Sequence, residues 1–236
     1  YGRSDAGLNH EEAMMEVGLL STVNVVMQQA SPALFDEALK KMFRFVSGSF
    51  FEIRVAGRYA SDMCRAAAKA DPEKALKLFV PHFCRMLKAR LANEDVSKEE
   101  HLDNEILWNL KLLSEVVRCN GIALLPHKES LIEVLRLTLH LKCKEGADLG
   151  NNLLKHILKA LTLIYNIDYR SYVMPEKDDE DFLPIKEWGQ PGNLDDLRLK
   201  WHVPSKEEKE FAAEVLEKFL GGELDRIKKH ISGDEM

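Results

Sequence analysis

The stretch SPALFDEALKKMFRFVSG, residues 31–48, carries the start signal, the apolar spacing and the stop signal of one amphipathic helix. Ser31 is suited to cap the first turn, and Pro32 fits the first helical position, where its missing N–H removes no hydrogen bond. Gly48 marks the end of the helix. The apolar residues between these signals recur at threes and fours: Leu34, Phe35, Ala38, Leu39, Met42, Phe43 and Val46. This spacing predicts a helix that buries one face.

A second stretch, DPEKALKLFVPHFCRMLKARL at residues 71–91, begins in the same way 40 residues later, with Asp71 as cap and Pro72 as first residue. Similar spacing predicts further helices at about 11–29, 51–69, 104–120, from 126, at about 148–166 and from 206. Paired helices with a period near 40 residues are typical of HEAT and armadillo repeats. We therefore expect an all-α, HEAT/armadillo-like α-solenoid of about four helix pairs, although a compact helical bundle of this length would show much the same pattern.

The regular pattern stops after residue 167 and resumes at Ser205, which caps the next helix and has Glu208 three residues on, as in a capping box. The acidic run from Glu176 to Asp181 is typical of a solvated loop. We therefore expect one long non-helical insertion. The predicted divisions are helical repeats at 1–167, the acidic and Trp-containing insertion at about 168–204, and a continuing helical repeat at 205–236.

The end of the insertion reads EWGQPGNLDDLRLKWHVP, residues 187–204, and it gathers two of the three tryptophans with two glycines and two prolines. Proline excludes a continuous helix here. Large aromatic side chains outside regular structure often pack onto a surface and determine the chain path. We expect Trp188 and Trp201 to pack on the flank of the helices, with Trp201 buried as an anchor for the insertion.

Composition excludes several classes of protein. A formal net charge of −6 argues against a surface built as a whole to bind nucleic acid. The four cysteines are far apart and form no zinc-site pattern, so we expect buried thiols in a reducing compartment.

No apolar run approaches the roughly 20 residues of a membrane span, and no signal peptide is evident. We expect an intracellular protein that does not contact a membrane. Because the apolar pattern is already running by Leu8, we also expect a piece of a longer chain.

Catalytic and metal-binding patterns do not emerge. His82 and His156 each stand alone, which is typical of half-buried helix residues. The GQPGN motif at 189–193 follows no predicted strand and precedes no GK[ST], so it indicates a turn and not a phosphate-binding loop. With no nucleophile and base to pair, the sequence predicts a protein that is not an enzyme and that holds no metal or cofactor.

Cationic side chains are frequent on and beside the helix predicted at 72–91: Lys69, Lys74, Lys77, Arg85, Lys88 and Arg90. Such a face could bind a polyanion, for example an inositol phosphate or a nucleic-acid backbone. We favour a solvated helix face balanced by the nearby carboxylates of Glu73, Glu94 and Asp95.

Residues 187–227, EWGQPGNLDDLRLKWHVPSKEEKEFAAEVLEKFLGGELDRI, resemble a segment of the giant HEAT-repeat proteasome activators, the proteasome activator subunit 4 or Blm-type family. The matching residues are Trp188, Gly189, Trp201, His202, Val203, Pro204, Ser205 and those from Glu207 onward. ALFDEALKKMFRFVSGSFFEIRVAGRYASDMCRAA, residues 33–67, is similar to the preceding repeats of the same family. The resemblance thus covers nearly all of this chain and a small part of a full-length member.

This resemblance implies a very long α-solenoid that caps the proteasome core particle without ATP or ubiquitin and promotes degradation of peptides and proteins. It further implies acetylated histones among the substrates, a place in nucleus and cytoplasm, and roles in DNA repair and spermatogenesis. An inositol phosphate is conceivable for a full-length member, but no residue here can be assigned to it.

Two features of the family have no counterpart in this sequence. The family's C-terminal hydrophobic-Tyr-X tail, which docks on the proteasome, does not match residues 233–236, and no acetyl-lysine-recognising segment can be placed. We therefore expect a segment of dome wall whose partners are the core particle and protein substrates, with no direct nucleic-acid binding. The alternative is a free-standing helical-repeat adaptor or transport scaffold.

Overall fold

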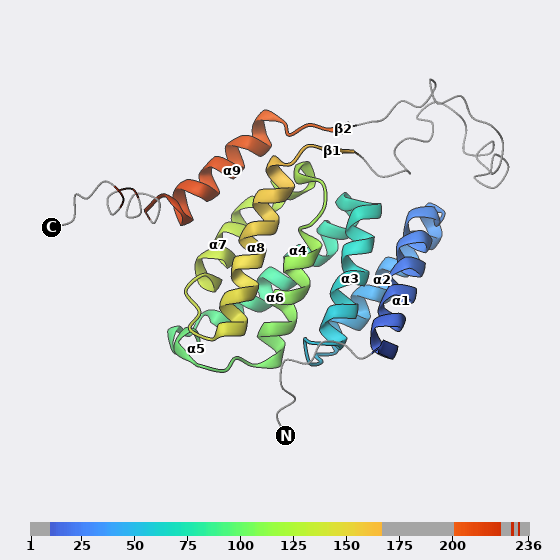
Figure 1. Cartoon of the computed structure of the whole chain (residues 1–236), viewed down its shortest axis with the longest axis horizontal. Coiled ribbons are helices and arrows are strands. Elements are labelled where there is room, and N and C mark those ends of the chain that lie inside the picture. Colours follow the sequence, from blue (N-terminus) through green and yellow to red (C-terminus); the bar gives the residue numbers. More distant parts are fainter. Residues whose placement is uncertain (1–9, 167–200, 223–227, 229–230, 232–236) are drawn as a thin grey trace. The chain divides into compact units, whose positions relative to one another are not determined.

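The computed structural model describes residues 10–166, 201–222, 228 and 231. These residues are almost entirely helical (Figure 1). The helices are α1 (His10–Gln29), α2 (Pro32–Gly48), α3 (Ala56–Ala70), α4 (Pro72–Leu91), α5 (Glu94–Lys98), α6 (Asn104–Val116), the 3-10 helix η1 (Gly121–His127), α7 (Lys128–Thr138), α8 (Lys144–Thr162) and α9 (Lys206–Phe219). The expectation of an all-α chain built from successive helix pairs is confirmed.

The helices of the larger compact unit form two layers. In one layer α1, α3, α6 and α8 are successive neighbours, and Figure 1 shows this row from α1 in blue to α8 in yellow. In the other layer α4 lies between α2 and α7. α9 packs on α8 and η1 at the end of the stack. Each helix therefore contacts its near neighbours in the stack, which is the arrangement of a solenoid.

Helix starts follow the local signals in the sequence. The Ser31 side chain accepts a hydrogen bond from the backbone N–H of Leu34 at α2, and the Asp71 side chain accepts one from Lys74 at α4. Both helices have proline in the first turn. The predicted caps are confirmed, because they depend only on residues within one turn of each other.

The predicted start of the third helix at Phe51 is wrong, since α3 begins at Ala56. The reason is local: the Glu52 carboxylate accepts hydrogen bonds from the backbone N–H groups of Arg54, Val55 and Ala56, at 2.7, 3.0 and 2.8 Å. These N–H groups bond to a side chain in place of backbone carbonyls, so the helix does not extend back to Phe51. Phe51 instead packs against the Trp108 ring, with a centroid separation of 5.6 Å.

Other boundaries differ by less than two turns. α6 ends at Val116, ahead of the Asn120-Gly121 ending that the sequence suggested, and the helix predicted from Pro126 is preceded by η1. α8 starts and ends four residues earlier than predicted. The short α5 was not predicted, because its five residues are too few to show a period.

A second compact unit holds two short strands, β1 (Tyr165–Asn166) and β2 (Trp201–His202). They pair antiparallel, with Tyr165 opposite His202 and Asn166 opposite Trp201. The acidic run and the GQPGN turn that the sequence placed in the insertion lie outside the described residues.

Candidate functional site

The structure describes some of the family-signature residues and not others. Trp188 and Gly189 lie outside the described residues, whereas Trp201 and His202 form β2. The Trp201 side chain is 54% exposed, so the prediction that it is buried is wrong, while His202 is 5% exposed. Neighbouring side chains of a strand point to opposite sides, so burial of His202 leaves Trp201 outward. The His202 ring packs against the Tyr165 ring, with centroids 5.0 Å apart.

The Ser205 signature residue has a structural role, and the predicted capping box is confirmed. The Ser205 hydroxyl accepts a hydrogen bond from the Glu208 N–H at 3.2 Å, and the Glu208 carboxylate accepts one from the Ser205 N–H at 2.8 Å. Glu208 is fully buried. A carboxylate at the first turn of α9 also complements the partial positive charge of the helix N-terminus.

Gly121 is the point where η1 comes closest to α8 and α9. A Cβ atom at this position would lie 2.5 Å from the Ala160 carbonyl oxygen of α8 and would also collide with the Glu208 carboxylate of α9. The backbone approach therefore requires glycine. The Asn120-Gly121 pair, which we interpreted as a helix ending, instead allows three elements to meet.

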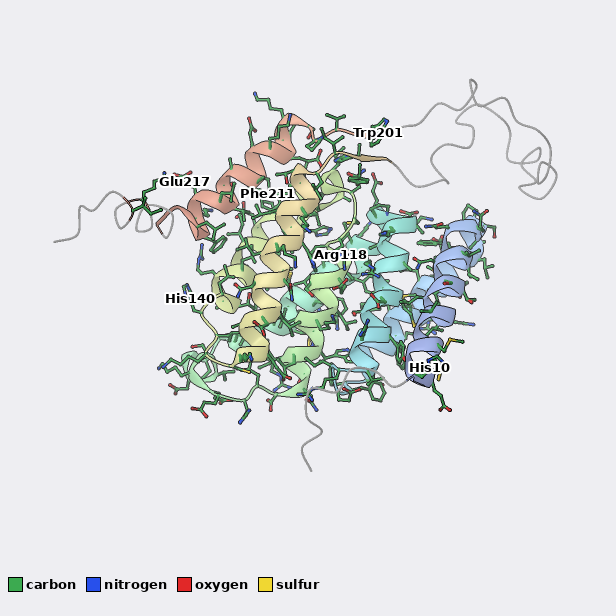
Figure 2. The ribbon with its side chains drawn as sticks, viewed as in Figure 1. His10, Arg118, His140, Trp201, Phe211 and Glu217 are labelled. Atoms are coloured by element: carbon green, nitrogen blue, oxygen red, sulfur yellow. The ribbon has the colours of Figure 1, made fainter. Side chains whose placement is uncertain are left out.

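The main polar feature of the helical face is a carboxylate that joins three cations. Glu115, on α6, has a side chain that is 8% exposed. It accepts hydrogen bonds from Arg65 of α3 at 3.1 Å and from Arg118 at 2.7 Å, and the Lys111 ammonium lies 3.8 Å away. Arg65 also pairs with Asp62 at 2.9 Å. Figure 2 labels Arg118, which follows the end of α6, the helix between α3 and α8.

Two opposing effects act on the Glu115 carboxyl. Burial disfavours its ionised form, but the hydrogen bond and charge of Arg118 and the charges of Lys111 and Arg65 outweigh burial, and the pKa of Glu115 lies below its ordinary value. The carboxylate is therefore ionised at neutral pH and holds α3 against α6.

His156 connects α8, the fourth helix of the row, to α6. Its Nδ1 atom lies 2.6 Å from the Ser114 carbonyl oxygen of α6. A carbonyl can only accept, so Nδ1 carries the hydrogen and donates it. Burial lowers the pKa of His156, which keeps the ring neutral. The sequence predicted a half-buried helix histidine, and His156 is buried more deeply than that. The sequence placed His156 correctly on a helix but did not indicate its partner, which is 42 positions away.

The cysteines match the expectation of buried thiols. Cys64, Cys84, Cys119 and Cys143 are all free and buried. Burial raises the pKa of Cys84 and of Cys119 to about 12, so neither thiol is activated as a nucleophile. Among the described residues no group of three or more His, Cys, Asp or Glu side chains could hold a metal ion. No helix in the described part of the chain is long and apolar enough to cross a membrane.

Three of the six cations near α4 pair with carboxylates, but with other carboxylates than those expected from the sequence. Lys74 pairs with Asp36 of α2 at 2.8 Å. Lys88 pairs with Glu133 of α7 at 2.6 Å, and Arg90 pairs with Glu105 of α6. These partners come from neighbouring helices and not from Glu73, Glu94 or Asp95. Lys69, Lys77 and Arg85 are exposed and have no carboxylate partner among the described residues.

The cluster around Glu115 was not predicted from the sequence. Lys111, Glu115 and Arg118 follow one another at spacings of four and three, so they share a stripe on an otherwise apolar helix. That stripe was the signal from which a charged cluster on this helix could have been predicted. It could not show that Arg65, 50 positions earlier, completes the cluster.

Comparison with known proteins agrees with this helical stack. A family model described as the mid HEAT repeats region of proteasome activator complex subunit 4 matches residues 3–235. The fold and this match define a HEAT-repeat protein. The chain belongs to the proteasome activator complex subunit 4 family, and the family resemblance is confirmed.

Individual relatives show how much of the family this chain represents. Proteasome activator complex subunit 4B of Danio rerio is 47% identical over 231 residues, covering 97% of this chain and 12% of that protein. Subunit 4 of Homo sapiens is 47% identical over 224 residues, covering 94% and 12%. Proteasome activator subunit 4 of Arabidopsis thaliana is 26% identical over 230 residues, covering 87% and 12%. The chain thus spans about an eighth of the length of these relatives.

Proposed function

We propose that these residues form a wall segment of an ATP- and ubiquitin-independent proteasome activator, which caps the core particle and regulates substrate entry. The observation that supports this proposal is the two-layer stack of helix pairs in a chain that belongs to the subunit 4 family. In this role the segment is a regulatory scaffold. It contributes no catalytic group and no cofactor, and it contacts neither membrane nor nucleic acid directly.

The exposed apolar surface of α1 supports a place inside a longer stack. Met14, Met15 and Val17 are 64%, 68% and 66% exposed. Such a surface is unfavourable in water and is expected where another helix pair packs. We propose that further repeats cover α1 in the whole protein, and that residues 1–236 self-associate when isolated.

The finer functions follow from the family. We propose acetylated histones among the substrates of the whole protein, a location in nucleus and cytoplasm, and participation in DNA repair and spermatogenesis. These functions belong to the assembled activator.

Hydrolysis of a fluorogenic peptide by purified core particles tests the proposal. The whole protein that contains these residues should raise the rate in a dose-dependent manner, without ATP. Residues 1–236 alone should leave the rate at its basal value, because one segment of wall cannot enclose the entrance. Stimulation by residues 1–236 would show an activating contact within these helices and would contradict a purely structural role.

A second experiment tests whether this helical stack contributes to activation. Substituting Gly121→Leu in the whole protein should force η1 away from α8 and lower the stimulation. Gly48→Leu, at the last residue of α2, is the matched control, because nothing lies within 4 Å of a Cβ atom at Gly48. Equal stimulation by both variants would contradict the idea that this stack shapes the activator.

A further inference from the structure

The C-terminal halves of α3, α6 and α8, together with Arg118 just after α6, bring cationic side chains onto one surface. We call this surface the basic face, and its members are Arg65, Lys69, Lys111, Arg118, Lys155 and Lys159. Two contacts place the three helices at the same level: Arg65 to Glu115 at 3.1 Å, and His156 to the Ser114 carbonyl at 2.6 Å. Lys155, next to His156, and Lys159, about one turn later, therefore lie level with the end of α6.

The carboxylates within these halves are too few to neutralise the basic face. They are Asp62 and Glu115, whose side chains are 10% and 8% exposed and already pair with Arg65, Arg118 and Lys111. Six cations against two carboxylates leave an excess of four positive charges, or three when the buried Glu208 of α9, which approaches Gly121 and Ala160, is counted. The next carboxylate along the chain after α3, Asp71, caps α4 and lies 3.8 Å from Lys74.

Helix dipoles reduce this excess without removing it. The C-terminus of each helix contributes about half a negative charge, or roughly one and a half for three helices. More than one positive charge remains. Lys69, Lys155 and Lys159 are exposed, and the Arg118 side chain is 42% exposed, so a ligand can reach the charge.

The buried pairs also determine which cations are available. The buried Glu115 carboxylate forms ion pairs with Arg65, Lys111 and Arg118, so these side chains are held in place before any ligand binds. The three exposed lysines are free of ion pairs among the described residues, apart from the hydrogen bond from Lys155 to Asn152 at 3.3 Å. Pre-organised cations lower the entropy that binding an anion would lose.

The geometry of the basic face fits an extended chain. Packed helices lie about 8–10 Å apart, so the three helix ends span roughly 20 Å. An extended peptide covers about 3.3 Å per residue, and about six residues therefore cross the face. We propose that the basic face binds an extended acidic polypeptide segment, with carboxylates on several of these residues. This inference goes beyond the proposed function and does not depend on it.

Nucleic acid fits the basic face less well than a peptide. Single-stranded nucleic acid is usually held by bases that stack on exposed aromatic rings. The aromatic side chain of α6, Trp108, is fully buried, and α8 has no Phe, Tyr or Trp. Tyr59 of α3 is partly buried and lies about a quarter turn away from the stripe of Arg65 and Lys69. The basic face therefore offers charge without a stacking platform.

Fluorescence anisotropy with a fluorescein-labelled octaglutamate peptide tests the proposal on residues 1–236. The test variant is K69Q/K155Q/K159Q. The control variant, K40Q/K98Q/K206Q, removes the same charge from exposed lysines that pair within their own helices with Glu37, Asp95 and Glu210. We expect the test variant to bind about tenfold more weakly than the unaltered chain, and the control variant to bind within about twofold of it. Equal losses in both variants, or no binding by the unaltered chain at about 50 mM salt, would overturn the proposal.

Two further probes define the ligand class. An octaglutamine peptide should not bind, and binding of this neutral peptide would contradict charge recognition. A labelled eight-nucleotide thymidine strand should bind more weakly than octaglutamate, and tighter binding of this strand to the basic face would overturn the assignment to a polypeptide. Thermal unfolding by circular dichroism should show both triple variants folded, because all six substituted lysines are exposed.

Discussion

The guanidinium group of Arg65, on α3, lies 3.1 Å from a carboxylate oxygen of Glu115, on α6 and 50 positions later in the chain. The same carboxylate accepts a hydrogen bond from Arg118 at 2.7 Å. Two neighbouring helices of one layer are thus joined by a charge pair that is shielded from water on the Glu115 side. The contact also aligns Arg65, in the last two turns of α3, with Glu115, in the last turn of α6.

Removing the Glu115 charge should destabilise the stack. In Glu115→Gln the three cations lose their shared anion, and the cost is smaller than for a fully buried pair because the cations are partly exposed. We expect the free energy of unfolding to fall by about 2–3 kcal/mol in urea denaturation. Glu217→Gln, at an exposed position on α9 (Figure 2), is the matched control and should change it by less than about 0.5 kcal/mol. A similar loss in both variants would show that the cluster has no special role.

The lowered pKa of Glu115 predicts that stability depends on pH. The pKa of Glu115 in the folded chain lies below its ordinary value of 4.5. Its carboxylate therefore stabilises the folded chain above that pH, and the contribution is lost as the pH falls through the lower, folded-state value. The difference in unfolding free energy between the unaltered chain and Glu115→Gln should be constant above about pH 5.5 and shrink below pH 4.5. Urea titrations at a series of pH values measure it, and a difference that grows on acidification would contradict the assignment.

Gly121→Ala tests the close approach of three elements. The added methyl group would meet the Ala160 carbonyl oxygen and the Glu208 carboxylate, and a backbone atom cannot move as easily as a side chain. We expect a loss of about 2–3 kcal/mol. Gly18→Ala makes the same change within α1, where nothing lies within 4 Å, and should stabilise the chain by about 0.5–1 kcal/mol. The two substitutions should therefore shift the melting temperature in opposite directions. Equal shifts would contradict the packing at Gly121.

Two tryptophans should respond differently to the same substitution. Trp108 is fully buried, and its indole N–H donates to the Val46 carbonyl oxygen at 3.0 Å. Trp108→Ala should cost roughly 3–5 kcal/mol and lower the melting temperature by about 10 °C. Trp201→Ala, at a side chain that is 54% exposed, should cost less than about 1 kcal/mol. A large loss at Trp201 would restore its predicted role as an anchor.

The sequence by itself determined the local features of this protein. The caps at Ser31, Asp71 and Ser205 and the apolar spacing that follows each of them were predicted correctly. The reason is physical: a helix cap and an amphipathic stripe involve residues within one or two turns, so their partners are visible in a short stretch of chain. The family resemblance was also readable from short motifs, and the match over residues 3–235 confirms it.

Tertiary structure decided which side chains are buried and which charges are paired. Lys88 pairs with Glu133, which is 45 positions away in the chain. The Trp108 N–H donates to the Val46 carbonyl oxygen, which is 62 positions away. The sequence predicted burial of Trp201, yet Trp201 is 54% exposed, whereas Trp108 is fully buried. Charge balance and burial depend on which helices become neighbours. Those neighbours follow from packing of the whole stack, which no local window of sequence contains.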